Sequence, residues 1–280
     1  MTDFISIVWV ITEKCDKECL ICHRFFNNEN NLSLEEQFEL LKYLKEQGIK
    51  RICFSGGEPT IFKSSLFEAI SYAHNLKLHT ALTTHGLNLN KTDIIKLDKI
   101  LDQILIPIRY LNSDNYESTN RIAGVFNRHI KYLLSWLMNS EIITEIVTVV
   151  TKHNLNSIID IGEIVFNISP NIRWRIDEYY SNGYNKKLEL DFQIADEQFG
   201  EVIQKVRSHF SDERNQLITF SSKLSRAKAP DLLITPQGNL VTTCNHESLP
   251  KGHYKSGIIS SMQTRRDQDY YKGSIRNWDW

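Results

Sequence analysis

The first two hundred residues alternate short apolar runs with longer segments in which apolar residues recur every three or four positions. The short runs are typical of buried β-strands, and the longer spacing is that of amphipathic helices. We expect strands at Ile5–Ile11, Arg51–Phe54, His79–Thr83, Gln103–Ile108, Ile143–Val150 and Arg173–Tyr179. Strands that alternate with helices predict an α/β fold, here an open partial (β/α)6 barrel.

The helix after the first strand has the clearest limits. Ser33 and Glu36 form a capping box at its start, and Gly48 marks its end. Further helices are expected at Ser65–His74, Thr92–Leu101, Asn127–Met138, Asn156–Phe166 and Asp196–His209. A strand followed by a helix is therefore the repeating unit of this part of the chain.

The pattern becomes polar after Phe210. Further on, Leu232–Thr235 and Asn239–Thr243 flank a Pro-Gln-Gly turn, which predicts a β-hairpin. We therefore expect a barrel at residues 1–210 and a small C-terminal cap with a tail at 211–280. The tail ends at Trp280, where a frayed end is the default expectation.

Composition and charge narrow the class of protein. The 280 residues include 33 Lys and Arg against 34 Asp and Glu, so no overall field attracts nucleic acid, and we expect no duplex partner. The first apolar run is far shorter than the roughly 20 residues of a spanning helix. No basic signal-peptide start follows Met1. We expect a cytoplasmic protein with no membrane partner.

Three of the five cysteines, Cys15, Cys19 and Cys22, lie within eight residues. They follow the first predicted strand, at the end of a parallel barrel where active sites are built. Three thiolates on a short loop can hold an iron–sulfur cluster and leave one iron without a protein ligand. A structural zinc site is the main alternative, although His23 is badly placed to share one metal with Cys22. Three unrelated core cysteines are a weaker alternative.

A second motif follows the second predicted strand, where the sequence reads Ser-Gly-Gly-Glu-Pro from Ser55 to Pro59. Paired glycines at a strand end let the backbone approach a ligand closely, and the carboxylate of Glu58 can pair with an ammonium group. A Gly-Gly turn alone is weak evidence for a site. Together with the cysteine triplet one strand earlier, it is strong evidence.

These two motifs resemble the signature of the radical S-adenosylmethionine (SAM) superfamily. The resemblance implies that Cys15, Cys19 and Cys22 hold a 4Fe-4S cluster whose fourth iron is chelated by SAM. It further implies an enzyme in which an electron from the cluster cleaves SAM to methionine and a 5'-deoxyadenosyl radical, which takes a hydrogen atom from the substrate. An electron donor such as flavodoxin or ferredoxin is then an expected partner.

Within the superfamily, the chain is most similar to the branch of viperin and to that of the molybdopterin-precursor GTP cyclase. Thr84-His85-Gly86 is similar to a Thr/Ser-Asn-Gly segment of these chains, with His in place of Asn. Arg109 falls where a Ser-x-Asp pattern commonly contacts the cofactor. The resemblance implies that SAM is bound by Ser55, Gly56, Gly57, Glu58, Thr84, His85 and Arg121.

Arginines on or beside the predicted strands suggest a substrate class. A planar, permanently charged guanidinium suits phosphate or carboxylate groups, and the matching positions in viperin are basic. We therefore predict a small polar, nucleotide-like substrate bound by Arg51, Arg173 and Arg175. The alternative is that these arginines pair with internal acids such as Asp177 or Glu178.

Two other functions remain open. The hairpin before Cys244 resembles the start of the auxiliary-cluster domain of peptide-modifying radical SAM enzymes. A second cluster needs about three or four cysteines, whereas only Cys53 and Cys244 remain, so we expect one cluster and two small buried residues. A peptide maturase is thus the alternative enzyme. The other alternative is a non-catalytic metal-binding protein that retains the fold, against which the intact Gly-Gly-Glu-Pro segment argues.

Overall fold

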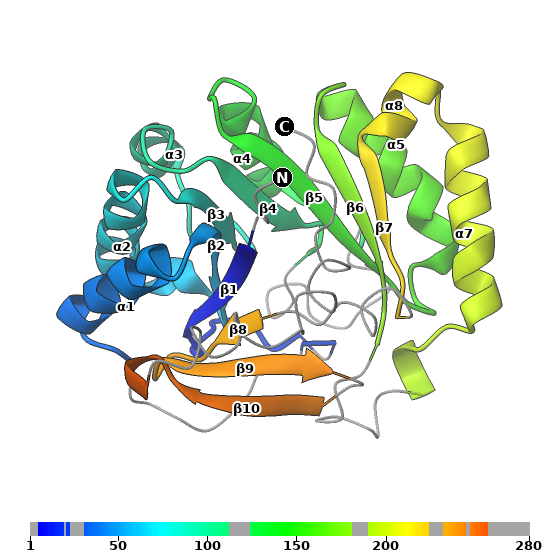
Figure 1. Cartoon of the computed structure of the whole chain (residues 1–280). Helices are drawn as coiled ribbons and strands as arrows, with labels where there is room; N and C mark the ends of the chain where they lie inside the picture. Colours follow the sequence, from blue (N-terminus) through cyan, green and yellow to red (C-terminus); the bar gives the residue numbers. More distant parts are fainter. Residues whose placement is uncertain are drawn as a thin grey trace. The chain divides into compact units, whose positions relative to one another are not determined.

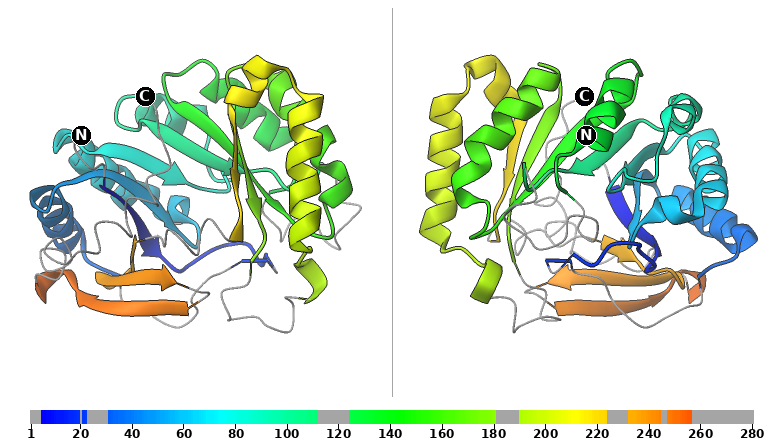
Figure 2. Two further views of the ribbon diagram at one scale, coloured as in Figure 1. Left: turned by 45° about the vertical axis from the view of Figure 1, so that its right-hand side comes forward. Right: turned by 180° about the vertical axis from the view of Figure 1, so that it is seen from behind.

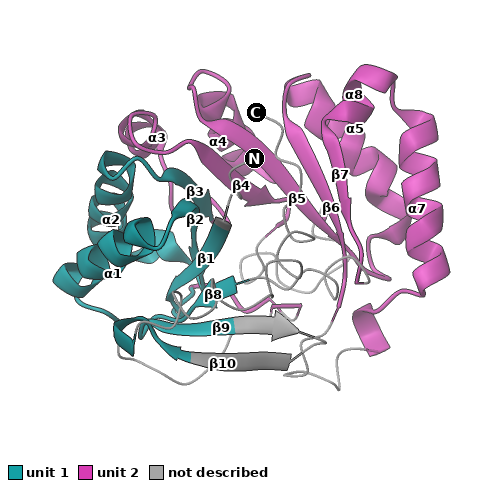
Figure 3. Cartoon of the chain, viewed as in Figure 1, with its two compact units in different colours: residues 1–15, 24–83, 224–280 teal, residues 16–23, 84–223 magenta. Residues whose placement is uncertain are grey.

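The structure is a computed structural model that describes residues 5–19, 21–22, 31–111, 124–180, 190–223, 232–244 and 247–256. It divides into two compact units, drawn in different colours in Figure 3. Unit 1 comprises residues 1–15, 24–83 and 224–280, and unit 2 comprises residues 16–23 and 84–223. The chain passes from unit 1 to unit 2 directly after Cys15, the first cysteine of the triplet.

In its described residues, unit 1 contains six strands in the order β10-β9-β8-β1-β2-β3. Strands β8, β1, β2 and β3 are parallel, while β9 and β10 continue the sheet in antiparallel pairing. The strands are β1 (Ile5–Thr12), β2 (Ile49–Gly56), β3 (His79–Thr83), β8 (Leu232–Ile234), β9 (Asn239–Cys244) and β10 (Glu247–His253). The helices are α1 (Leu34–Glu46), α2 (Lys63–Asn75) and the short 3-10 helices η1 (Pro59–Phe62) and η4 (Tyr254–Ser256).

The described part of unit 2 contains four parallel strands in the order β4-β5-β6-β7. The strands are β4 (Gln103–Pro107), β5 (Ile143–Val150), β6 (Arg173–Glu178) and β7 (Ile218–Ser221). The helices are α3 (Lys91–Leu97), α4 (Arg128–Leu137), η3 (Leu155–Ser157), α5 (Ile158–Ile168), α7 (Asp196–His209) and α8 (Asp212–Gln216).

Helices α1 and α2 lie side by side along the sheet of unit 1 (Figures 1 and 2). Helix α1 begins at the predicted capping box, in which the Ser33 side chain accepts from the backbone of Glu36 and the Glu36 side chain accepts from the backbone of Ser33. The Phe38 and Tyr72 rings stack between the two helices, with centroids 4.3 Å apart. This packing buries the apolar face of α1 that the sequence pattern indicates.

Trp174 of β6 forms the aromatic core of unit 2. Its fully buried ring packs edge-on against Phe166 of α5 and Phe210 after α7. The indole Nε1 donates a hydrogen bond to Thr148 Oγ1 (2.9 Å), so the polar edge of the ring is satisfied. Because side chains alternate along a strand, Arg173, Arg175 and Asp177 project from the face of β6 opposite to that of Trp174.

The predicted alternation of parallel strands and helices is confirmed, and the predicted hairpin corresponds to β8 and β9. Two strands, β7 and β10, escaped the sequence analysis. Strand β8 pairs in parallel with β1, so the hairpin extends the main sheet of unit 1. The proposed division of the chain at residue 210 remains a prediction. Among the described residues, no helix is long and apolar enough to span a bilayer.

Candidate functional site

The three clustered cysteines lie on the segment that follows β1, residues 13–22, here called the cysteine loop; its residue 20 is outside the described part of the chain. Cys15 and Cys19 are half-buried and Cys22 is exposed, and none of these three cysteines is part of a disulfide. The backbone N–H of Cys22 donates to the carbonyl oxygen of Cys19 (3.0 Å), which closes a turn between these two residues. The donor set is therefore accessible and unoxidised, as a thiolate-ligated metal centre requires.

In unit 1, the start of the cysteine loop is fixed to the end of β2 by main-chain hydrogen bonds. The amide of Gly57 donates to the carbonyl oxygen of Thr12, and the amide of Glu58 donates to that of Lys14, both at 2.7 Å. The amide of Lys14 donates in turn to Thr12 Oγ1 (3.1 Å). We call this set of contacts the backbone clamp.

Only glycine fits the two central positions of the backbone clamp. Gly56 has φ +146°, and a Cβ atom there would collide with the carbonyl oxygen of Thr12. A Cβ atom on Gly57 would collide with the carbonyl oxygens of Glu13 and Lys14. The approach of a ligand at this glycine pair remains a prediction, and the group that approaches the pair in the structure is the base of the cysteine loop.

The side chain of Glu58 caps the 3-10 helix η1, which directly follows the backbone clamp. The carboxylate is buried, with 1% of the residue exposed. Its Oε1 accepts from the amide of Thr60 (2.9 Å) and from the Thr60 hydroxyl, and thereby caps η1. One carboxylate oxygen is thus used inside the motif. The predicted pairing of Glu58 with the SAM ammonium group remains a prediction.

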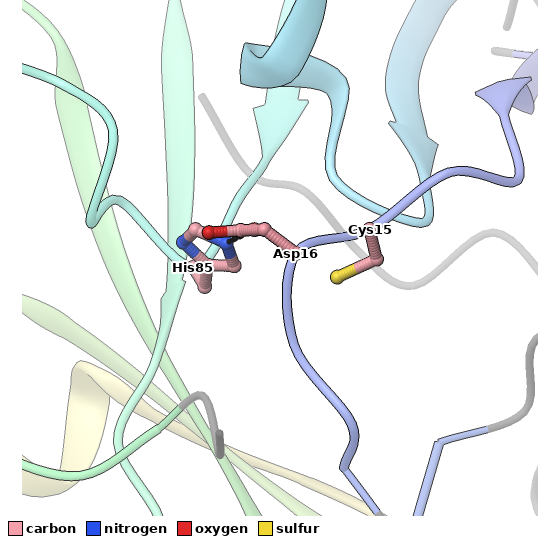
Figure 4. A group of neighbouring side chains, drawn as sticks. All are labelled: Cys15, Asp16 and His85. Atoms are coloured by element: carbon pink, nitrogen blue, oxygen red, sulfur yellow. Dashed lines mark hydrogen bonds and ion pairs between the residues drawn. The ribbon is translucent and has the colours of Figure 1, made fainter. Parts of the chain in front are cut away.

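In unit 2, Asp16 and His85 face each other, with His85 Nε2 2.8 Å from Asp16 Oδ1 (Figure 4). Burial of Asp16 by itself would raise the pKa of its carboxyl group. The hydrogen bonds that Asp16 accepts from His85 and Lys17 outweigh burial, so the pKa of Asp16 is lowered. Lys17 Nζ lies 3.3 Å from the second carboxylate oxygen. Asp16 therefore carries a negative charge directly after Cys15.

The far end of the cysteine loop is held by an apolar contact. Ile21 is buried in a cluster with Tyr179 and Phe192, against which Val149 packs. The Tyr179 and Phe192 rings lie 5.8 Å apart between centroids. Because Ile21 lies between Cys19 and Cys22 in the chain, its burial limits the positions that these two cysteines can take.

Asn154 joins the carboxyl ends of β4 and β5. Its Nδ2 donates to the carbonyl oxygen of Arg109 (3.1 Å), and its Oδ1 accepts from the amide of Thr151 (2.8 Å). Beside this link, burial raises the pKa of the Tyr110 phenol, although the charge of Arg109 acts in the opposite direction.

Of the arginines predicted to bind substrate, Arg175 pairs with internal acids. Its Nε lies 3.2 Å from Asp177 Oδ1, and its Nη1 lies 3.9 Å from Glu145 Oε1. Gln103 Nε2 donates to the other Glu145 oxygen (2.7 Å). The alternative weighed for these arginines, pairing with acids such as Asp177, is thus confirmed for Arg175. It does not test whether a substrate also binds there.

Arg51 and Arg173 lie near the amino ends of their strands. Arg51 is buried at the third position of β2 and donates to Ser6 Oγ (3.1 Å), and Arg173 is the first residue of β6. Active sites in parallel α/β folds form at the opposite, carboxyl ends. Arg121 lies outside the described residues, so its predicted SAM contact is not described.

Two further cysteines, Cys53 and Cys244, lie outside the cysteine loop. Cys53 is buried, with its sulfur 3.4 Å from Thr83 Oγ1, so the expectation of a small buried residue is confirmed there. The side chain of Cys244 and the whole of Trp280 lie outside the described part of the chain.

Sequence reasoning missed two charged contacts in unit 2. Asp16 was not identified, because its contact with His85 joins positions 69 residues apart and no local pattern encodes it. At the carboxyl ends of β6 and β7, Lys223 Nζ lies 3.1 Å from Glu178 Oε1, and the Lys223 amide donates to Glu178 Oε2 (2.8 Å). A charged residue at the end of a buried strand was the available signal for Glu178.

Comparison with known proteins supports this description. The profile of the Radical SAM superfamily matches residues 9–165. An S-adenosylmethionine-dependent nucleotide dehydratase of Flammeovirga pacifica is 28% identical over 215 residues, 71% of each chain. A GTP 3',8-cyclase of Helicobacter pylori is 31% identical over 118 residues, 40% of this chain and 36% of that protein.

A solved structure shows the same fold. The structure of Streptococcus suis SuiB bound to its precursor peptide SuiA superposes with a TM-score of 0.73 at 15% identity, over 99% of this chain and 68% of that one. The likeness confirms the predicted open partial (β/α)6 barrel. The superfamily uses a 4Fe-4S cluster and SAM, and its members are enzymes. With more than half of the chain matched by the profile, the protein belongs to the Radical SAM superfamily.

Proposed function

We propose that the chain holds one 4Fe-4S cluster on Cys15, Cys19 and Cys22 and binds SAM at the end of β2. The backbone clamp carries this proposal, because it fixes the base of the cysteine loop beside Gly57 and Glu58 through two hydrogen bonds of 2.7 Å. Because a side chain at Gly56 or Gly57 would collide with the backbone of residues 12–14, this close approach depends on the glycine pair. The proposed SAM contacts are Ser55, Gly56, Gly57, Glu58, Thr84 and Arg121.

The residues of the site fit this pair of cofactors. Three cysteines on one loop, none of them in a disulfide, suit a cluster with an open iron. When bound, the cluster supplies the electron that cleaves SAM and so makes a hydrogen-abstracting radical available. The chain would bind the cluster through its thiolates, and the backbone clamp and the burial of Ile21 restrict the loop that carries them.

We further propose a small polar, nucleotide-like substrate. The support comes from the printed activities of the two relatives, a nucleotide dehydratase and a GTP cyclase. Arg175 is the proposed contact with its anionic groups, while Arg51 and Arg173, which lie near the amino ends of their strands, remain predictions from the sequence. For Arg175, a substrate phosphate has to compete with Asp177 for the guanidinium. We also propose a cytoplasmic location and a protein reductant, because a clustered free-thiol site needs a reducing compartment.

Peptide modification is the second candidate. It is favoured by the fold likeness to SuiB, whose structure holds a precursor peptide. At 15% identity that likeness carries the fold alone. The two candidates differ in substrate and share the same cofactors, so they are separated only by turnover.

The cofactor assignment is tested by anaerobic reconstitution. We expect about four irons per chain, with visible absorption that bleaches on reduction. Replacing Cys15, Cys19 or Cys22 with Ala should abolish the cluster, while Cys53→Ala, in the same unit as Cys15, should leave the iron content unchanged. One tetrahedral zinc and no iron under these conditions would refute the assignment.

The substrate class is tested by the formation of 5'-deoxyadenosine under a strong reductant. A slow basal rate is expected with SAM alone, and a nucleoside triphosphate in a screened panel should raise it. No response to any nucleotide, together with a clear response to a peptide encoded nearby, would transfer the proposal to the peptide-modifying class.

A further inference from the structure

An imidazole–carboxylate pair lies in unit 2 directly after the first cysteine of the cysteine loop. His85 Nε2 and Asp16 Oδ1 are 2.8 Å apart, and the side chains are 3% and 39% exposed (Figure 4). A buried ring thus holds a carboxylate that lies at the surface. The sequence predicted a contact between His85 and SAM, whereas the contact in the structure is with the loop.

The ring is oriented from its other side. The amide of Leu87 donates to His85 Nδ1 (3.0 Å), so Nδ1 is an acceptor and the hydrogen of the neutral ring is on Nε2. Nε2–H is then the donor to Asp16. The amide of Gly86 donates to Thr84 Oγ1 (3.0 Å), which fixes the turn that carries the ring. These bonds hold the imidazole in one orientation, as second-shell hydrogen bonds do around metal ligands.

The position of Asp16 gives the contact its consequence. Asp16 follows Cys15 and precedes Cys19 by three residues, so fixing its side chain restricts the backbone between two proposed cluster ligands. Lys17 Nζ contacts the second carboxylate oxygen at 3.3 Å. A loop that is already ordered loses less conformational entropy when it wraps a ligand. Asp16 and His85 therefore favour the cluster-binding shape of the loop.

We infer that Asp16 and His85 are positioning residues that hold the cysteine loop for cluster binding, and that His85 acts through Asp16 and not on SAM. The inference rests on the proposed function, because it presupposes a cluster on the three cysteines. It assigns no chemistry to either side chain. Its measurable consequence is the rate at which the protein loses its iron–sulfur cluster.

Three variants separate the parts of the pair. His85→Leu replaces the ring with an apolar side chain and so removes the N–H donor. His85→Gln returns a donor, and Asp16→Ala removes the acceptor. The measured quantity is the rate at which the reconstituted protein loses its visible absorption to a chelator. We expect the rate to rise about tenfold in His85→Leu and Asp16→Ala. We expect His85→Gln to stay within about threefold of the wild type.

The double variant tests whether the residues act as one unit. His85→Leu combined with Asp16→Ala should lose its cluster no faster than either single variant, because all three lack the same contact. Rates that multiply in the double variant would overturn the inference. If Asp16→Ala does not fold, Asp16→Asn replaces it: it keeps the size of the side chain and removes its charge, and an intermediate rate is expected.

A matched control exists in the same unit. His209 Nε2 and Glu163 Oε1 form an exposed pair at 2.6 Å. His209→Leu and Glu163→Ala remove the same chemical contact from helices α7 and α5. We expect both variants to lose their cluster at the wild-type rate. A faster loss in either of them would mean that any lost ion pair destabilises the cluster, which contradicts the inference.

A second readout separates the loop from SAM. We expect reduced His85→Leu to keep the change that SAM causes in the electron paramagnetic resonance spectrum of the cluster, with SAM affinity within about twofold of wild type. About tenfold weaker SAM binding at an unchanged rate of cluster loss would assign His85 to SAM and overturn the inference. Failure of the wild type to bind a four-iron cluster would instead refute the proposed function.

Discussion

The two ends of the cysteine loop are held by different kinds of contact. In unit 1, main-chain amides of Gly57 and Glu58 hold main-chain oxygens of Thr12 and Lys14. In unit 2, side chains hold the loop, through Asp16 with His85 and through the burial of Ile21. A backbone contact tolerates many side chains and excludes a few, whereas a side-chain contact depends on the identity of both residues.

This difference determines which end of the loop is visible in a sequence. The backbone clamp needs two glycines in a row, and a Gly-Gly pair after a strand can be found by inspection. The side-chain contacts need a carboxylate, an imidazole and an apolar residue, all of which occur throughout the chain. The same difference predicts how severely each contact responds to substitution.

The largest effect is expected at Gly57. In Gly57→Ala the new Cβ atom meets the carbonyl oxygens of Glu13 and Lys14, which belong to the backbone and cannot rotate away. We expect a loss of about 3 kcal/mol in the free energy of unfolding, together with loss of SAM binding and cluster retention. Denaturant unfolding and equilibrium dialysis with SAM measure the two quantities.

Gly200→Ala is the control for this prediction. Gly200 lies in α7, and no atom lies within 4 Å of a Cβ atom placed there. Alanine should therefore stabilise the helix by about 0.5–1 kcal/mol. If Gly57→Ala is as harmless as Gly200→Ala, the backbone clamp does not constrain the loop.

The next effect is expected at Ile21. Ile21→Ala removes three carbon atoms from the cluster with Tyr179 and Phe192, which should lower the free energy of unfolding by about 2 kcal/mol. The iron–sulfur cluster should also be lost faster to a chelator, because Cys19 and Cys22 are then less restrained. Leu190→Ala is the control, since Leu190 is 76% exposed and should change neither quantity. Equal effects in both variants would argue against an anchoring contact.

The sequence predicted the secondary structure well where the apolar runs are long. Strands β3 and β5 begin and end at the predicted residues, and α7 does as well. Strand β7 was missed because Ile218–Ser221 is short and half polar. Strand β10 contains Pro250 and Gly252, two residues that argue against a strand in any sequence pattern. These two strands form through pairing with a neighbour, which local patterns do not show.

For the residues of the candidate site, the sequence predicted the residue types but not the contacts that they make. The glycine pair indicated a close approach, but the sequence could not show that Glu13 and Lys14 of the same chain approach it. The charge of Arg175 was evident, whereas its contacts with Asp177 and Glu145 depend on two strands in register. Residue types can be read from a sequence, and their partners require the fold.

A smaller effect is expected at Arg175. Arg175→Met leaves Glu145 and Asp177 without their shared cation, and should lower the free energy of unfolding by about 1–2 kcal/mol in the absence of substrate. Arg128→Met, at an exposed position of α4, is the control and should have little effect. The KM of a stimulating nucleotide shows whether Arg175 also contacts substrate. A raised KM in Arg175→Met supports a substrate contact, and an unchanged KM with lower stability shows a purely internal pair.

The smallest effect is expected in the capping box of α1, which takes no part in holding the cysteine loop. The hydrogen bond from the Ser33 backbone, followed by that from Lys255, lowers the pKa of Glu36 from its ordinary value of 4.5. A carboxyl group with a lowered pKa stabilises the fold above its unfolded pKa, and the benefit is lost as the pH falls through the folded pKa.

Glu36→Gln should therefore melt slightly below the wild type at neutral pH, and the two melting temperatures should converge as the pH falls below about 4. Added salt should remove the part due to Lys255, because that pair is exposed. Glu35→Gln removes a charge from the same helical turn and leaves the capping box intact, so its difference from wild type should be smaller. A Glu36→Gln difference that persists unchanged into acid would show that the charge of Glu36 does not stabilise the helix.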